Sequence, residues 1–515
     1  MGLLAALLPA CSHHAASTAP RPKKGGILRV GLARPASLDP ALAQSDEELL
    51  LARQIFSTLT VADPATLVAR PALAASWQAT PDQTQWDFTL RPNAVFANGR
   101  PITAADVQAS LDRVARKQTG SPAADLLSVV HGFSDFNSGQ APDLVGIAAP
   151  SPTVVHVVLD QPLSVLPVLL SSPVFGIVPA DAASSPGFAQ QPVGSGAFGV
   201  VTRTGDHLSL RPSPGSTAYL DGIDATFFDD VAASYHAFQA GQLDWSRVPA
   251  EEESAAGKRY GTAPSSPYLA ELFYGFNVKT PTFADPRFRE AIMHAIDRRA
   301  LVTTVYKDTV EPLDGIVVRG LPARQDDPCG DRCVFDVARA KALVAQAFPP
   351  PAAPPQVAID YDDDPTQDAV AKAIQADLTA VGIPVVLDPK PIADYPKFAV
   401  SGQQQLFRLG WVAAYPSADA FLAPLFASGS ASNLTGFSAT EVDQALAAAR
   451  KEPDPRQRDL DYQAAERAVM AQLPVVPIAQ FDLPAVAAAT VRGLVPSVTG
   501  TFDATAVWLT TGRSH

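Results

Sequence analysis

Residues 73–114 have the sequence LAASWQATPDQTQWDFTLRPNAVFANGRPITAADVQASLDRV, in which an alternating apolar pattern gives way to a helical one. The alternation places Trp86, Phe88 and Leu90 on one face of an extended strand, because successive side chains of a strand point to opposite faces. Packing in the core accounts for these aromatic side chains without a ligand. We therefore predict a half-buried strand in this part of the chain.

A capped helix is predicted soon after that strand. Thr103 is followed three residues later by Asp106, which suits a capping box. In a capping box the side chain of each of the two residues accepts a hydrogen bond from the backbone N–H of the other. The apolar residues that follow recur at helical spacing. They are Val107, Leu111 and Val114.

Two further helices have readable boundaries. Asp285 and Pro286 suit the N-cap and first turn of one helix, and the other begins at Thr366 and stops at Gly382. Their apolar stripes consist of Phe288, Ile292 and Ile296, and of Val370, Ile374, Leu378 and Val381, respectively. Tyr361 and the three aspartates after it are predicted to form the strand-to-helix turn before the second of these helices. Strands and helices alternate throughout, which predicts a mixed α/β protein.

Length and composition indicate a large packed protein with several lobes. The 515 residues suggest about three units at roughly 150 residues per domain. Apolar residues make up 47% of the chain and charged residues 18%, which excludes a disordered chain. The net charge of −13, without a long basic run, argues against nucleic acid as a partner.

The first residues resemble the lipobox of a bacterial lipoprotein. A short apolar run ends in Leu8-Pro9-Ala10-Cys11, so we expect residues 1–10 to be the remnant of a signal peptide that begins upstream of Met1, and Cys11 to carry the lipid. The following residues to position 26 are polar and Pro-containing, which is typical of a flexible tether. The protein would then be anchored to the outer face of the cytoplasmic membrane.

The two remaining cysteines predict a disulfide. Cys329 and Cys333 stand in PCGDRC, and a small closed loop suits an oxidising compartment. A zinc site would need further ligands, and no other Cys or His lies nearby in sequence. We expect no metal site and no cofactor.

Sequence motifs for catalysis are missing, and the nucleotide-like motif lacks its context. Residues 194–199, GSGAFG, match G-x-G-x-x-G, but the following residues predict two strands joined at residues 204–206 rather than the helix that would hold a pyrophosphate. The chain contains no Walker A, H-E-x-x-H or G-x-S-x-G sequence. We expect no enzymatic activity.

Several motifs in order resemble those of the family 5 extracellular solute-binding proteins, the dipeptide- and oligopeptide-binding receptors of ABC importers. Residues 73–114 are one of them. The others are GGILRVGLARPASLDP (25–40), PVGSGAF (192–198), AFQAGQLD (237–244), FNVKTPTFADPRFREAIMHAIDR (276–298) and RLGWVAAYPSADAFLAPLF (408–426). The resemblance implies a periplasmic-binding-protein-like α/β fold of two hinged lobes, with a third subdomain inserted in lobe I.

The resemblance also implies a division of the chain. The expected parts are the tether (11–26), lobe I (27–73, 175–276 and the tail 485–515), the inserted subdomain (74–174) and lobe II (277–484). We expect a monomer that associates with permease subunits in the membrane.

Ligand contacts are expected around the Gly-Trp pair of the last motif. The resemblance implies main-chain and aromatic contacts from Gly410, Trp411 and Val412, followed by Ala414 and Tyr415. Peptide receptors of the family usually carry a carboxylate where this chain has Ala414. We expect either another acid, Asp419 or one of Asp46, Glu47 and Glu48, to replace it, or a ligand without a free α-ammonium at that place.

The predicted function is capture of a peptide or related solute for an ABC importer. The alternatives are a receptor for haem, a metal chelate or a glycan, and an accessory lipoprotein without a transport ligand. A lipid-anchored hydrolase on the same scaffold would need a nucleophile and a base at the ligand site.

Overall fold

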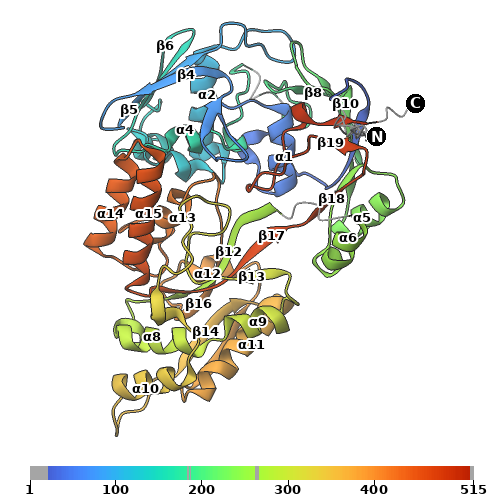
Figure 1. Cartoon of the computed structure of the whole chain (residues 1–515). Helices are drawn as coiled ribbons and strands as arrows, with labels where there is room; N and C mark the ends of the chain where they lie inside the picture. Colours follow the sequence, from blue (N-terminus) through green and yellow to red (C-terminus); the bar gives the residue numbers. More distant parts are fainter. Residues whose placement is uncertain (1–20, 182–184, 186, 261–265, 511–515) are drawn as a thin grey trace, which may run out of the picture.

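The computed structural model describes residues 21–181, 185, 187–260 and 266–510, and the predicted signal remnant and lipid-bearing Cys11 lie outside them. Figure 1 shows an elongated molecule with the described N- and C-terminal segments near each other at the upper end. The described strands form two six-stranded sheets, one four-stranded sheet and two small ribbons. The predicted α/β class is confirmed.

The first six-stranded sheet is assembled from both ends of the chain. The short strand β18 pairs with β11 at its edge, next to the parallel pair β1 and β10. In sheet order the strands are β18 (Ala485–Ala487), β11 (Trp245–Arg247), β1 (Ile27–Ala33), β10 (Gly222–Phe228), β9 (His207–Pro212) and β8 (Phe198–Arg203). The helices beside it are α1 (Asp46–Ile55), α5 (Val231–Gln239) and α6 (Glu253–Tyr260).

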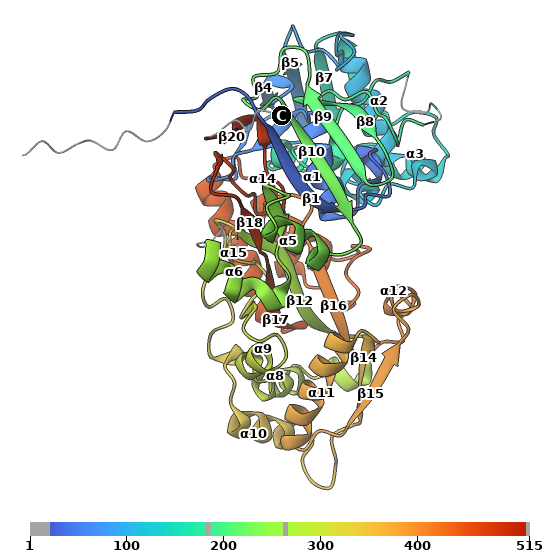
Figure 2. The same ribbon diagram turned by 90° about the vertical axis from the view of Figure 1, so that its right-hand side faces the viewer.

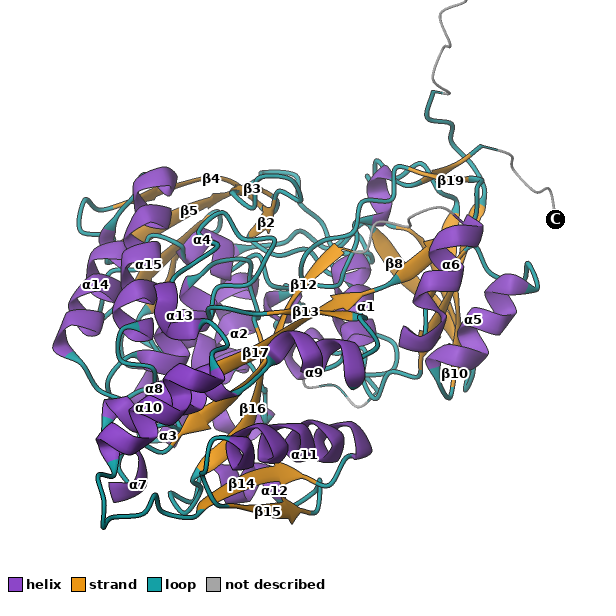
Figure 3. Cartoon of the chain, turned by 60° about the horizontal axis from the view of Figure 1, so that its bottom comes forward, coloured by secondary structure: helices purple, strands orange, loops and turns teal. Residues whose placement is uncertain are grey.

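The second six-stranded sheet forms the centre of the molecule and continues into its lower end (Figure 2). Its strands, in sheet order, are β13 (Val310–Pro312), β17 (Val475–Leu483), β12 (Ser266–Phe276), β16 (Leu406–Val412), β14 (Val357–Asp362) and β15 (Val385–Lys390). Figure 3 shows helices gathered around this sheet. They are α7 (Pro281–Ala284), α8 (Pro286–Ala295), α9 (Arg298–Thr304), α10 (Val337–Ala347), α11 (Pro365–Ala380), α12 (Tyr395–Ala399), α13 (Asp419–Phe426), α14 (Thr440–Lys451) and α15 (Pro455–Met470).

The four-stranded sheet contains the sequence that opened the analysis. Its order is β4 (Ala74–Ala79), β5 (Gln85–Leu90), β7 (Val154–Val158) and β6 (Ile147–Ser151), with helices α2 (Ala104–Ala115), α3 (Phe133–Ser138) and α4 (Leu166–Leu169). The ribbons are β2 (Thr60–Ala62) with β3 (Ala69–Pro71), and β19 (Val491–Arg492) with β20 (Trp508–Leu509).

The predicted helix caps are confirmed in detail. Asp106 and Thr103 form the capping box of α2, and the Asp285 side chain caps α8, which has Pro286 in its first turn. Helix α11 starts at Pro365, one residue before the predicted start, because Asp364 accepts from the first free N–H groups.

The expected boundary after residue 276 does not coincide with the change from one sheet to the other. Strand β12 was assigned to lobe I, but it pairs with β16 and β17 along its length, so the second sheet already includes Ser266. The chain leaves that sheet after Leu483 and joins the first one at Ala485. The division into lobes is our interpretation of these two sheets.

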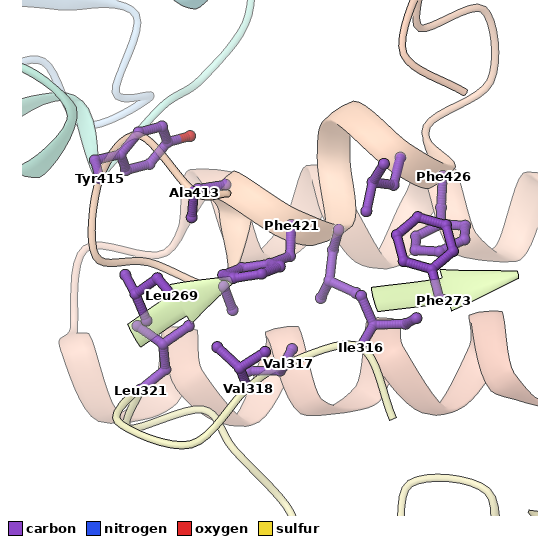
Figure 4. Packing of buried hydrophobic residues seen from close by; sticks show 14 of the residues in the cluster. Leu269, Phe273, Ile316, Val317, Val318, Leu321, Ala413, Tyr415, Phe421 and Phe426 are labelled. Carbon is purple, nitrogen blue, oxygen red and sulfur yellow. The ribbon is translucent and has the colours of Figure 1, made fainter. Parts of the chain in front are cut away.

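The largest apolar core joins the second sheet to the four-stranded one. In Figure 4, Phe421 and Phe426 of α13 pack against Leu269 and Phe273 of β12. A backbone hydrogen bond from Ser164 to the carbonyl oxygen of Arg450 on α14 adds a polar link between the two parts. Among the described helices, none is long and apolar enough to cross a membrane.

Candidate functional site

Strand β16 has an edge that is open over most of its length. It pairs with β12 from its first residue to its last, but with β14 only at its first two residues. The N–H of Ala413, directly after the strand, donates to the carbonyl oxygen of Leu269 on the β12 side. Because the main-chain groups of alternate residues point to opposite edges, those of Gly410 and Val412 point away from β12. The strand therefore presents main-chain donors and acceptors at its free edge.

The residues of this edge differ in exposure. Gly410 is exposed, and Val412 is 55% exposed although it is apolar. Trp411 is partly buried, and its indole N–H donates to the carbonyl oxygen of Ala420 at 2.7 Å. The indole therefore fixes the turn into α13, while the main chain on either side of it is accessible.

An arginine lies beside this edge. The Arg408 guanidinium is 3.6 Å from the position that a Cβ on Gly410 would take, and it forms an ion pair of 3.2 Å with Asp362. Its side chain keeps 28% of its surface exposed. The edge thus combines unpaired main-chain donors and acceptors with a cation that can form an ion pair with a negative group of a ligand.

Ala414 lines a cavity of about 190 Å³ that the sequence did not reveal. The cavity lies between α1, the turn at Ser171, the segment after β16 and the C-terminal loop. Most of its wall is apolar, but Arg53 of α1 and Asp503 of the C-terminal loop line it too. Sequence reasoning missed both residues because they are remote in sequence from the Gly-Trp motif and belong to no motif.

Asp419 lies away from the cavity at Ala414, so its position gives no support to the prediction that it replaces the missing acid. Its side chain has no exposed surface, and its Oδ1 lies 2.7 Å from Nε of Arg450. The hydroxyl groups of Tyr415 and Tyr462 donate to the same carboxylate. Burial works against the charged form, but Arg450 and these hydroxyl groups outweigh it and hold the pKa of Asp419 below its ordinary value.

Tyr415 belongs to the same buried group. Only 4% of its surface is exposed, and its hydroxyl oxygen lies 2.8 Å from Oδ2 of Asp419. The structure therefore gives Tyr415 a packing contact, and its ligand contact stays a prediction. The reason is that the chain turns inward after Ala414 to start α13.

The acids at the start of α1 lie outside the cavity at Ala414. Glu48 is buried and accepts N–H groups at both ends of the loop before the helix, while Asp46 accepts from the Tyr268 hydroxyl at 2.6 Å. Burial raises the pKa of Glu47, and the charge of Arg247 partly offsets this. None of these three acids lines the cavity.

Two other predicted features have a plain structural role. Cys329 and Cys333 form a disulfide. After the G-x-G-x-x-G motif come the strands β8 and β9, as predicted, and a Cβ on Gly194 would meet the Ile55 carbonyl oxygen at 2.1 Å. The glycine is needed for close packing against the end of α1, not for a phosphate.

Comparisons with known proteins agree with this fold. The profile of the bacterial extracellular solute-binding proteins, family 5, matches residues 68–433. The dipeptide-binding protein DppE of Bacillus subtilis is 26% identical over 84% of this chain and 82% of its own length. The periplasmic murein peptide-binding protein MppA of Escherichia coli is 27% identical over 87% of this chain and 86% of its own.

Solved structures show the same architecture. The unliganded open form of MppA superposes with a TM-score of 0.81 over 95% of this chain and 97% of that one, at 24% identity. OppA of Burkholderia pseudomallei gives a TM-score of 0.74 over 95% and 99%, at 25% identity. These matches confirm the predicted periplasmic-binding-protein fold, and the profile covers most of the sequence. The chain belongs to the family 5 bacterial extracellular solute-binding proteins, a family of binding proteins and not of enzymes.

Proposed function

We propose that this protein captures peptides along the free edge of β16 and delivers them to the permease of an ABC importer. The observation that carries the proposal is the main chain of Gly410 and Val412, whose outer edge pairs with none of the described strands. A peptide in an extended conformation adds to such an edge as a further strand, and its backbone supplies the binding energy whatever its side chains are.

The charge beside the edge supports the same ligand class. Arg408 keeps 28% of its side-chain surface exposed, and its guanidinium lies next to Gly410. A carboxylate is the natural partner for this fork of N–H donors. In this proposal the C-terminal carboxylate of a short peptide meets Arg408, while the peptide backbone pairs with Gly410 and Val412.

The relatives support a peptide as well. Among the proteins that this chain resembles are a dipeptide-binding and a murein peptide-binding protein, and a structurally similar DppA from Helicobacter pylori was solved with the peptide STSA. Several relatives are named as binding proteins of ABC transporters. We extend that association to this chain.

The proposed location is the outer face of the cytoplasmic membrane. Cys11 would carry the lipid, and the polar residues after it would span the distance to the first sheet, which begins at Ile27. Trp411 and Glu47 stay predicted ligand contacts, Trp411 because it borders the free edge.

Calorimetry with synthetic tripeptides tests the main-chain contacts. We expect the peptides to bind and their backbone N-methylated forms to bind about tenfold or more weakly, since each lost N–H removes a hydrogen bond. Val412→Pro should weaken binding similarly, whereas Val412→Ala, which keeps the backbone N–H, should not.

Two outcomes would contradict the proposal. Equal binding of methylated and unmethylated peptides would remove the strand-addition mechanism. A response only to haem, nickel chelates or glycans would identify another solute class, and no response to any of them would favour an accessory lipoprotein.

A further inference from the structure

The cavity at Ala414 contains a cation that the protein itself does not neutralise. Within the described part of the chain, Nη2 of Arg53 donates one hydrogen bond, to the Ser171 carbonyl oxygen at 3.1 Å. The guanidinium forms no ion pair with any described carboxylate. The remaining N–H donors therefore have room for a partner in the cavity.

Arg53 is partly buried, and this partial loss of water makes the lack of a partner unfavourable. Loss of water around Arg53 lowers the pKa of its guanidinium, and the charge of Asp503 offsets this only in part. An arginine stays protonated in proteins, so it cannot escape the penalty by losing its proton. An anion brought by a ligand would remove the penalty.

Asp503 lines the same cavity and could bind a ligand ammonium, so it is the alternative to Arg53 as the residue that holds the end of the ligand. We call it the competing anchor. Its Oδ1, however, caps the turn that follows by accepting from both the N–H and the hydroxyl of Thr505, and the residue is exposed. An exposed, hydrogen-bonded acid has little to gain from a ligand. The unsatisfied charge of the cavity is thus the cation.

The cavity lies where a peptide on the β16 edge would end. Ala414 is two residues beyond Val412, which corresponds to about 7 Å along an extended chain. We infer that the end of the bound peptide at Ala414 carries a carboxylate on an N-terminal substituent, held by Arg53, instead of a free α-ammonium. This inference rests on the proposed peptide function and specifies its ligands as N-blocked, acidic peptides.

The space suits a short acidic group. At about 30 Å³ per water molecule, a cavity of about 190 Å³ holds roughly six waters or a short acyl chain. Arg53, Val61 and Asp503 also line a neighbouring cavity of about 790 Å³, so a longer substituent could continue into it.

A competition experiment with the full chain isolates the charge. A lysine-free pool of tripeptides is prepared in four N-terminal forms: free amine, acetyl, succinyl and the neutral succinamoyl. The protein is incubated with all four forms together, separated from unbound peptide, and the retained forms are quantified by mass spectrometry. We expect the succinyl form to be enriched about tenfold over the succinamoyl form.

Variants assign that preference to Arg53. Arg53→Gln should abolish the succinyl preference, Arg53→Lys should retain part of it, and Arg456→Gln, at an exposed arginine of α15, should leave it unchanged. Asp503→Asn is the test of the competing anchor. It should not weaken binding of the free-amine form.

The outcomes separate the two proposals. Enrichment of the free-amine form, or a succinyl preference that Arg53→Gln leaves intact, would overturn this inference and keep the peptide function. Retention of none of the four forms would overturn the peptide function and this inference with it.

Discussion

Arg450 and Arg53 differ in whether the protein supplies a carboxylate partner for the guanidinium. Arg450 of α14 keeps 19% of its side chain exposed and is paired with the buried Asp419, which also accepts from two tyrosine hydroxyl groups. Arg53 of α1 borders a cavity and forms no ion pair with a described residue. The charge of Arg450 is therefore paired within the protein, whereas a ligand could supply the partner for the charge of Arg53.

A buried acid shows why the second arginine points to a ligand. Glu271 of β12 is 1% exposed, and neither of its carboxylate oxygens has a hydrogen-bond partner among the described residues. Burial, and then the nearby Glu466, raise the pKa of Glu271 well above its ordinary value. A carboxyl group can become neutral in this way, but a guanidinium cannot. The acid can therefore do without a ligand, whereas Arg53 keeps its charge and would gain from an anion in the cavity.

The largest expected effect is at the paired site. Asp419→Ala leaves Arg450 buried without a partner and should lower the free energy of unfolding by about 3–5 kcal/mol, measured by urea titration. Because the pKa of Asp419 is lowered in the fold, its contribution is present above the ordinary Asp pKa and is lost as pH falls through the lowered value. Asp461→Ala, at a partly exposed acid of α15 that forms no ion pair with a described residue, is the control. Unchanged stability with lost peptide binding would instead restore Asp419 as a ligand contact.

Glu271→Gln should raise the free energy of unfolding, in contrast to Asp419→Ala. The unfolded chain releases this proton above a pH of about 4.3, whereas the folded protein keeps it, so wild-type stability falls as pH rises toward the raised pKa. The variant should gain roughly 1–3 kcal/mol at pH 7, and the gain should shrink toward pH 4. Glu466→Gln, whose carboxylate accepts N–H groups from Ile316 and Val317, should lose stability under the same conditions. A pH-independent effect of Glu271→Gln would contradict the buried neutral acid.

Restoring an acid at the cavity sharpens the comparison. Ala414→Asp places a carboxylate in the wall that it shares with Arg53 and should reverse the preference from succinyl to free-amine peptides by about tenfold. Ala414→Asn provides the uncharged control in the same competition assay. A succinyl preference that survives the new carboxylate would show that Arg53 does not determine it.

The smallest effect on folding is expected at Arg53 itself. Arg53→Gln removes one hydrogen bond together with a poorly solvated charge, so the free energy of unfolding should change by less than about 1 kcal/mol. Urea titration beside Asp419→Ala checks this. If both variants lose several kcal/mol, Arg53 is a structural residue like Arg450, and the contrast between the two sites fails.

The elements that the sequence predicted correctly rest on local interactions. Two helix caps illustrate this: the capping box of Thr103 and Asp106, and the cap at Asp285. Each involves residues within one turn of each other, so the sequence is enough to predict it. The sheet to which β12 belongs could not be predicted, because its neighbours β16 and β17 follow far later in the chain. The pairing of Asp419 could not be predicted for the same reason, since its partner Arg450 comes from another helix.

The sequence by itself determined the α/β class, the family and the open question at Ala414, because local periodicity and ordered motifs do not depend on long-range contacts. Only the tertiary structure decided which charged side chains line the cavity at Ala414. Arg53 and Asp503 come from opposite ends of the chain, and the cavity exists because α1 and the C-terminal loop fold onto the segment after β16. Long-range packing, which no local pattern encodes, brings the three residues together.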